Sequence, residues 1–80
     1  MNPPVVVYSK PRCQPCTATK RRLREKGVEF EEADIREPGN LEAAKALGHL
    51  EAPVVVVGKV SWSGFRPDLI DELVKERLGG

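Results

Sequence analysis

The sequence has few aromatic residues, one histidine and no long apolar run. A bilayer span takes about 20 apolar residues, and the longest apolar run here, residues 54–57, is far shorter. Residues 1–4 lack the charged and apolar regions of a signal peptide. Basic residues number 13 and acidic residues 12, so the formal net charge of +1 gives no general attraction to nucleic acid or to an anionic membrane. We therefore expect a protein of the cytosol that binds neither.

The chain is also too short for more than one core. Its 80 residues contain no repeat, no low-complexity segment and no linker. We therefore predict a single domain over residues 1–80, and we expect a monomer. A chain of this length buries only about 60% of the surface that its unfolded form exposes, so the core must be compact and centred on a sheet.

Apolar patterning and turn residues divide the chain into seven elements. Strands are predicted at residues 5–8, 28–34, 54–57 and 60–62, and helices at residues 15–26, at residues 40–47 and from residue 67 onward. This βαβαββα order predicts an α/β fold in which three helices cover both faces of a mixed four-stranded sheet. The first crossover should be right-handed with parallel strands, and Gly58-Lys59 should form the turn of a closing hairpin.

Capping residues set the expected helix ends. Gly27 and Gly48 each follow the last residue of a predicted helix, where a left-handed glycine stops the helix. Asn40, after the Pro38-Gly39 breaker, is a good N-cap for the second helix. The third helix should start near Pro67 and carry its apolar residues on one side, namely Leu69, Ile70, Leu73, Val74 and Leu78.

The only two cysteines, Cys13 and Cys16, lie where a buried strand ends and a helix begins. A bridge between them would close a tiny loop and constrain little of the unfolded chain, so a chemical role accounts for them better than a stabilising one. The unpaired N–H groups and the dipole at a helix N-terminus favour a thiolate at Cys13, and Lys10 and Arg12 add positive charge. Pro15 suits the first helical position, where its missing N–H costs nothing.

We predict that Cys13 is exposed and attacks a disulfide on a partner protein, and that Cys16, one turn later and beneath it, resolves the mixed disulfide. Two alternatives stay open for the pair. A structural zinc site needs about four ligands, and His49 is the only histidine, so we expect no metal and no cofactor and assign His49 no role. The thiols could also be inert.

Ala52-Pro53 precedes the strand at residues 54–57 and is a second candidate for a functional role. A cis bond here would turn backbone groups beside Cys13 outward, where an extended partner segment could hydrogen-bond to them. On local sequence an ordinary trans proline is the more frequent case. Within the predicted fold we expect the cis form.

Trp62, Ser63, Gly64 and Phe65 form the loop before the last helix and contain half of the four aromatic residues. Aromatic side chains in loops are effective docking anchors, which predicts a partner-binding surface. The alternative is that both rings cap the small core. Gly64 is expected to adopt a conformation closed to other residues.

Residues 20–24 are dense in positive charge. Such a run could attract an acidic partner. More often it is the solvated side of a helix, and here it also complements the dipole at the helix C-terminus.

Three segments together give the chain a resemblance to the NrdH-redoxins, glutaredoxin-like proteins of the thioredoxin fold. They read Cys13-Gln14-Pro15-Cys16, Ala52-Pro53-Val54-Val55 and Trp62-Ser63-Gly64-Phe65-Arg66-Pro67-Asp68. The resemblance covers essentially the whole chain and implies a minimal thioredoxin fold. It also implies an electron donor to class Ib ribonucleotide reductase that thioredoxin reductase re-reduces, an electron-transfer protein rather than a metabolic enzyme.

By the same resemblance, Cys13 is similar to the attacking cysteine, Cys16 to the resolving one and Pro53 to the cis-proline. The other partner-binding positions implied are Gln14, Pro15, Ala52, Trp62, Ser63, Gly64 and Phe65. Gln14-Pro15 departs from the family, in which Val or Met followed by Gln is frequent; a proline beside the second cysteine is a thioredoxin feature.

Two other functions are compatible with parts of the sequence. A glutaredoxin-type enzyme that uses glutathione or another small thiol would resemble this chain in fold, but such enzymes typically carry a Gly-Gly-x-Asp type turn before the last helix. Here a single glycine and the bulky Phe65 occupy that region, which favours reduction by a protein. The second alternative function is a non-catalytic binding module that merely retains its cysteines. A Cys13→Ser variant would distinguish such a module from a redoxin, because a protein that only binds would still bind its partner.

Overall fold

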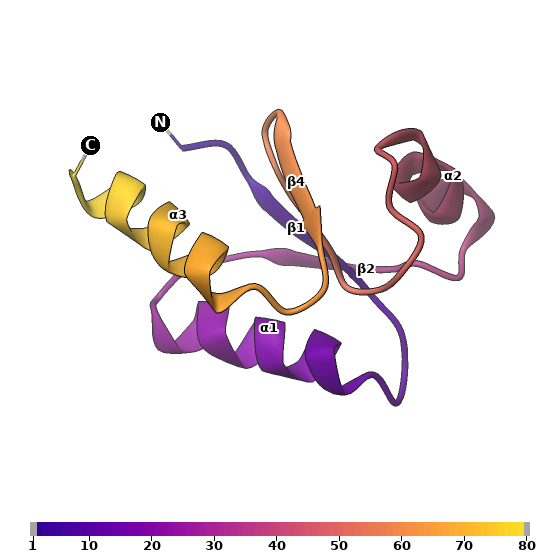
Figure 1. Cartoon of the computed structure of the whole chain (residues 1–80), viewed down its shortest axis with the longest axis horizontal. Coiled ribbons are helices and arrows are strands. Elements are labelled where there is room, and N and C mark those ends of the chain that lie inside the picture. Colours follow the sequence, from indigo (N-terminus) through magenta and orange to yellow (C-terminus); the bar gives the residue numbers. More distant parts are fainter. Residues whose placement is uncertain (1, 80) are drawn as a thin grey trace.

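The computed structural model describes the backbone of residues 2–79 and the side chains up to residue 77. Figure 1 shows the seven elements in the predicted βαβαββα order. Their bounds are β1 Val5–Ser9, α1 Gln14–Glu25, β2 Glu31–Asp34, α2 Pro38–Ala46, β3 Val54–Val57, β4 Val60–Ser63 and α3 Pro67–Gly79.

The four strands form one mixed sheet in the order β2-β1-β3-β4. β1 runs parallel to β2 and antiparallel to β3, and β3 pairs antiparallel with β4 across the predicted hairpin. Val7 lies opposite Val55, and Val55 opposite Trp62, so these three side chains share one face of the sheet. The predicted fold class, strand pairing and hairpin are confirmed.

Two helices cover one face of the sheet and one helix covers the other. α1 and α3 contact each other and lie on the same side of the strands, whereas α2 lies apart from them (Figure 1). The larger core fills the α1/α3 side and consists of Val5, Val7, Leu23, Val28, Val55, Val57, Trp62, Ile70 and Leu73. The α2 side has a smaller core of Ile35, Ala44 and Val54. Leu78, predicted for the apolar side of α3, has a side chain outside the described part of the chain.

The second strand is shorter than predicted because the end of α1 uses the backbone that precedes it. Gly27 has φ +72°, and the N–H groups of Gly27 and Val28 donate to the carbonyls of Arg24 and Leu23, at 3.0 and 2.9 Å. This is the left-handed helix stop predicted for Gly27. Val28 is buried, but its N–H belongs to the helix end, and the ladder starts only at Glu31.

The prediction that Asn40 caps the second helix is wrong. α2 begins two residues earlier at Pro38, with Glu37 as N-cap and no side-chain capping bond. The fixed φ of proline suits a first helical position, so Pro38 starts the helix rather than preceding it. The Asn40 side-chain amide instead donates to the backbone carbonyl of Asp34, at 2.9 Å, and ties the first turn of α2 to the end of β2.

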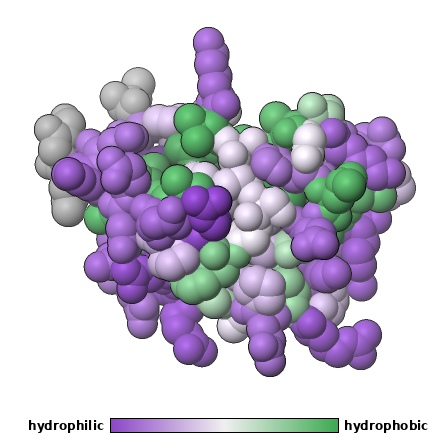
Figure 2. Space-filling view, viewed as in Figure 1, coloured by the Kyte–Doolittle hydropathy of each residue, from purple (hydrophilic) through white to green (hydrophobic). Residues whose placement is uncertain are grey.

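The outer surface has no large apolar area in the face shown. Figure 2 shows its hydrophobic residues as separate patches between hydrophilic side chains. No helix within residues 2–79 is long and apolar enough to cross a membrane.

Candidate functional site

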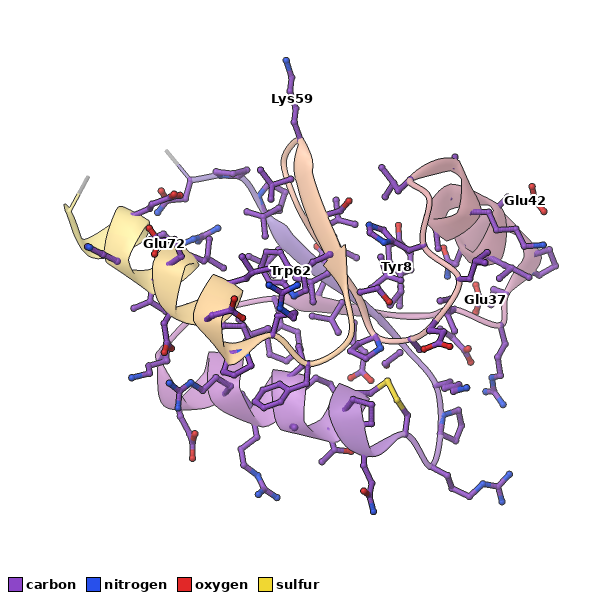
Figure 3. All side chains as sticks on the ribbon, in the orientation of Figure 1. Tyr8, Glu37, Glu42, Lys59, Trp62 and Glu72 are labelled. Atoms are coloured by element: carbon purple, nitrogen blue, oxygen red, sulfur yellow. A yellow bond between two sulfur atoms is a disulfide. The ribbon has the colours of Figure 1, made fainter. Side chains whose placement is uncertain are left out.

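The two cysteines form a disulfide at the start of α1, just beyond the C-terminal end of β1 (Figure 3). Their Cα atoms lie 5.2 Å apart. Cys13 is the N-cap residue of the helix, and Pro15 is the second helical residue, one position later than predicted, because the helix begins at Gln14. The strand-to-helix position inferred from the sequence is therefore confirmed.

The first turn of α1 forms hydrogen bonds with both the sulfur and the backbone carbonyl of Cys13. Its Sγ accepts a hydrogen bond from the Cys16 N–H, at 3.2 Å, and so caps one of the unpaired donors of the first turn. Its carbonyl accepts from the N–H and the hydroxyl of Thr17, at 3.1 and 3.2 Å. The sulfur is thereby aimed at the positive end of α1, where a thiolate is favoured.

The two cysteines differ in burial. Cys13 retains 8% of its surface and Cys16 only 1%, so the predicted ranking is confirmed. The expectation that Cys13 is openly exposed is wrong for this disulfide form. Its sulfur is bonded to Cys16 on one side and lies 3.9 Å from the carbonyl oxygen of Ala52 on the other, which leaves a small accessible area.

The Ala52–Pro53 bond is cis, as predicted. The carbonyl of Pro53 accepts a hydrogen bond from the Gly64 N–H, at 2.9 Å, and the Ser63 hydroxyl donates to the Glu51 carbonyl, at 2.6 Å. Gly64 has φ +86°, the left-handed conformation expected of it. These bonds join the loop after β4 to the loop before β3, a link that no local pattern in the sequence signals.

Trp62, which lies in β4, and Phe65, which lies in the loop after it, occupy different environments. Trp62 is 6% exposed and packs in the larger core, between the hairpin and the helices (Figure 3). The prediction that Trp62 offers a docking surface is therefore wrong, because β4 alternates and position 62 points inward beside Val55. Phe65 lies beyond the end of the strand and is 39% exposed, so this ring is available at the surface.

Lys10 and Arg12, predicted to support the thiolate, are both exposed beside the site. Neither forms an ion pair within residues 2–79. Arg12 has φ +55°, a left-handed conformation that is uncommon for a residue with a side chain. The turn that redirects the chain from β1 into α1 therefore places its least favourable backbone next to Cys13.

Two of the four basic residues in the run at residues 20–24 form ion pairs within the molecule. Lys20 pairs with Glu32 and Arg22 with Asp71, both at 2.7 Å. Hydrogen bonds from Lys20 and Ser9 lower the pKa of Glu32, and the Arg22 guanidinium lowers that of Asp71. The guanidinium of Arg24 lies over the Phe30 ring, 5.3 Å from its centroid.

No group of three or more histidine, cysteine, aspartate or glutamate side chains is placed to hold a metal ion in the part of the chain that the structure describes. His49 Nε2 lies 2.9 Å from the hydroxyl of Ser61. This contact joins the segment after α2 to β4, and nothing in the sequence around His49 predicts it.

A cysteine pair that opens the first helix, beside a cis-proline loop and on a β2-β1-β3-β4 sheet, places the protein among the thioredoxin-fold redox proteins. The glutaredoxin family matches residues 5–62. The chain belongs to this family and, within it, to the glutaredoxin-like NrdH proteins.

The relatives support this assignment over most of the chain. The glutaredoxin-like protein NrdH of Escherichia coli K12 is 43% identical over 70 residues, which cover 86% of each chain. NrdH of Lactococcus lactis subsp. lactis is 37% identical and covers 86% of this chain and 97% of its own. The solved NrdH-redoxin of E. coli, which has a thioredoxin-like activity profile, superposes with a TM-score of 0.81 over 86% of this chain and 92% of that one.

Proposed function

We propose that the protein donates electrons from its Cys13–Cys16 dithiol to the disulfide of a class Ib ribonucleotide reductase and is re-reduced by thioredoxin reductase. The observation that carries the proposal is the disulfide at the N-terminus of α1, in which Cys13 retains more exposed surface than Cys16. Membership of the NrdH group supports these two protein partners.

In the proposed reaction, the Cys13 thiolate attacks one sulfur of the partner disulfide, and the other partner sulfur leaves as a thiolate. Cys16 then loses its proton to the surrounding water and attacks the sulfur of Cys13. The mixed disulfide breaks, the second partner thiolate leaves, and the Cys13–Cys16 disulfide remains. Two electrons have passed to the partner, and the reductase returns them by the reverse exchange.

Docking in this proposal uses the loop before β3. The Pro53 carbonyl is already bonded to Gly64, and proline has no N–H. Ala52 therefore supplies the main-chain groups nearest to Cys13, and its carbonyl lies 3.9 Å from the sulfur. An extended partner segment could pair with Ala52, and the exposed Phe65 follows Gly64, whose N–H is bonded to the Pro53 carbonyl.

The alternative reductant, a small thiol, has less support. In the stretch that would hold its carboxylate, the Asp68 carboxylate is paired with Arg66 through two hydrogen bonds, at 3.0 and 3.1 Å, which lower its pKa. Phe65 occupies the place of a second glycine. Because Phe65 adds bulk where a glycine would leave space, and because Arg66 already pairs with Asp68, this surface suits a protein partner better than glutathione.

A coupled assay tests the proposal. One arm supplies NADPH with thioredoxin reductase, and the other supplies NADPH with glutathione and glutathione reductase; both use a class Ib ribonucleotide reductase as acceptor and follow NADPH oxidation. We expect turnover in the first arm only, and none with Cys13→Ser. Efficient turnover only with glutathione would replace the proposal with the small-thiol function.

A further inference from the structure

A groove of about 400 Å³ opens directly beside the reactive sulfur. Its lining consists of Arg12, Cys13, Gln14, Thr17, Ala18 and Arg21. Five of these residues belong to one stripe of α1 or to its N-cap, because positions 14, 17, 18 and 21 follow helical spacing. No acidic residue lines the groove among the residues that the structure describes.

The two arginines of this groove are among several basic residues that form no ion pair within the part of the chain that the structure describes. Lys20, Arg22, Arg36 and Arg66 all form ion pairs. Within residues 2–79, neither Arg12 nor Arg21 does so. With a formal net charge of only +1 for the whole chain, these two guanidinium groups beside Cys13 are a local concentration of positive charge, and a guanidinium fork matches a carboxylate well.

The distance along α1 from its first residue to Arg21 sets the length of the segment that the groove could hold. Seven helical steps separate Gln14 from Arg21, which is roughly 10 Å along the axis. An extended peptide spans roughly the same length with about three residues. A partner segment whose cysteine lies at Cys13 would therefore bring the adjacent residue near Arg12 and a residue about three positions away near Arg21.

We infer that the groove formed by Arg12 and Arg21 is the docking site for an acidic segment that flanks the target disulfide in the partner protein. The inference rests on the proposed function and specifies the chemistry of its substrate. Arg21 acts as a specificity-determining residue that holds the segment while Cys13 attacks. Arg12 contributes positive charge beside the sulfur, but its left-handed backbone conformation makes it the poorer residue to substitute.

The test compares two synthetic peptides that each contain an intramolecular disulfide. In one peptide the residues flanking the reactive cysteine are glutamates, and in the other they are glutamines. Disulfide exchange with the reduced full chain is followed by mass spectrometry at low salt and at 0.5 M salt. A third series moves a single glutamate from one to six positions away from the cysteine, on either side.

We expect the wild type to prefer the acidic peptide by roughly tenfold at low salt, and the preference to disappear at high salt. Arg21→Gln should lower this ratio to about two, and Arg21→Lys should keep most of it. The single glutamate should act best about three positions from the cysteine. Lys59→Gln removes the same charge at the tip of the hairpin, where Lys59 points away from the molecule (Figure 3), and should keep the full ratio.

Two results would overturn the inference and leave the proposed function standing: equal rates for both peptides in the wild type, or an equal slowing of both in Arg21→Gln. The second result would assign Arg21 to thiolate stabilisation, which acts on every disulfide alike. A wild type that reduces neither peptide would overturn the inference and the proposed function together.

Discussion

At the scale of single residues, the two sulfurs of the site differ in access and in charge environment. Cys13 lies at the positive end of α1 and keeps some exposed surface, whereas Cys16 is enclosed. Because alkylation requires an accessible thiolate, iodoacetamide near neutral pH should label Cys13 well before Cys16 in the reduced protein. Peptide mapping after short exposure measures the order, and faster labelling of Cys16 would reverse the roles assigned to the two cysteines.

The resolving role of Cys16 predicts a trapped intermediate. Cys16→Ser should still attack a partner disulfide through Cys13 but lack the thiol that releases the partner. A covalent adduct through Cys13 should accumulate with a peptide from the reductase tail and disappear with dithiothreitol. Intact-mass spectrometry detects it, with Cys13→Ser as the matched control that forms none. The absence of an adduct in Cys16→Ser would argue against the two-step exchange.

The two aromatic rings near the site should respond oppositely to truncation. Trp62→Ala empties a buried position in the larger core and should cost about 3 to 5 kcal/mol of unfolding free energy. Phe65→Ala removes an exposed ring and should leave the thermal midpoint nearly unchanged, while raising the Michaelis constant with thioredoxin reductase by up to roughly thirtyfold, about 2 kcal/mol. A large fall in midpoint for Phe65→Ala with normal kinetics would assign this ring to the core instead.

At the scale of elements, the Asp34 carboxylate forms hydrogen bonds at the junction between β2 and α2. Asp34 accepts hydrogen bonds from the guanidinium of Arg36 and, as the smaller contribution, from its backbone N–H, and these bonds lower the pKa of Asp34 from 3.8 to about 2. Because the folded pKa lies below the ordinary value, the stabilisation is complete above about pH 4 and is lost as the pH falls toward 2.

Asp34→Asn should therefore make the loss of stability between pH 4 and pH 2 shallower than in the wild type. Urea midpoints measured across pH 2–6 test this. Glu42→Gln is the matched control, because Glu42 is a carboxylate that points into solvent from α2 (Figure 3), and its profile should follow that of the wild type. Parallel profiles for all three proteins would show that Asp34 does not couple this junction to pH.

At the scale of the whole molecule, the dithiol should be a strong reductant. Pro15 stands next to the second cysteine as in thioredoxins, and the small-thiol turn is absent, so we expect a potential nearer to thioredoxin, at about −270 mV, than to glutaredoxins, at about −200 to −230 mV. A redox titration against glutathione buffers, read by alkylation of the free thiols, measures it. A value above about −200 mV would favour the small-thiol function.

The sequence predicted those parts of the fold that local chemistry decides. Pro15 indicates the first turn of α1 and Gly27 its stop, and the apolar run from residue 54 to residue 57 defines an inner strand. Prediction from the sequence failed where contacts between residues far apart in the chain determine the structure. Asn40 had an ideal local setting for a cap, but the carbonyl of Asp34 takes its amide. The environment of Trp62 depends on which face of β4 meets the helices, a question that its neighbours in the sequence leave open.

The capping bond from the Cys16 N–H to the sulfur of Cys13 links folding to redox state through a thermodynamic cycle. A thiolate is a stronger acceptor at a helix N-terminus than a disulfide sulfur, so this bond stabilises the folded reduced chain more than the folded oxidised chain. The difference between the unfolding free energies of the two forms must equal the shift in potential that folding causes, with about 30 mV for each 1.4 kcal/mol. Two urea titrations, one on each form, would thus measure how far the fold itself tunes the couple.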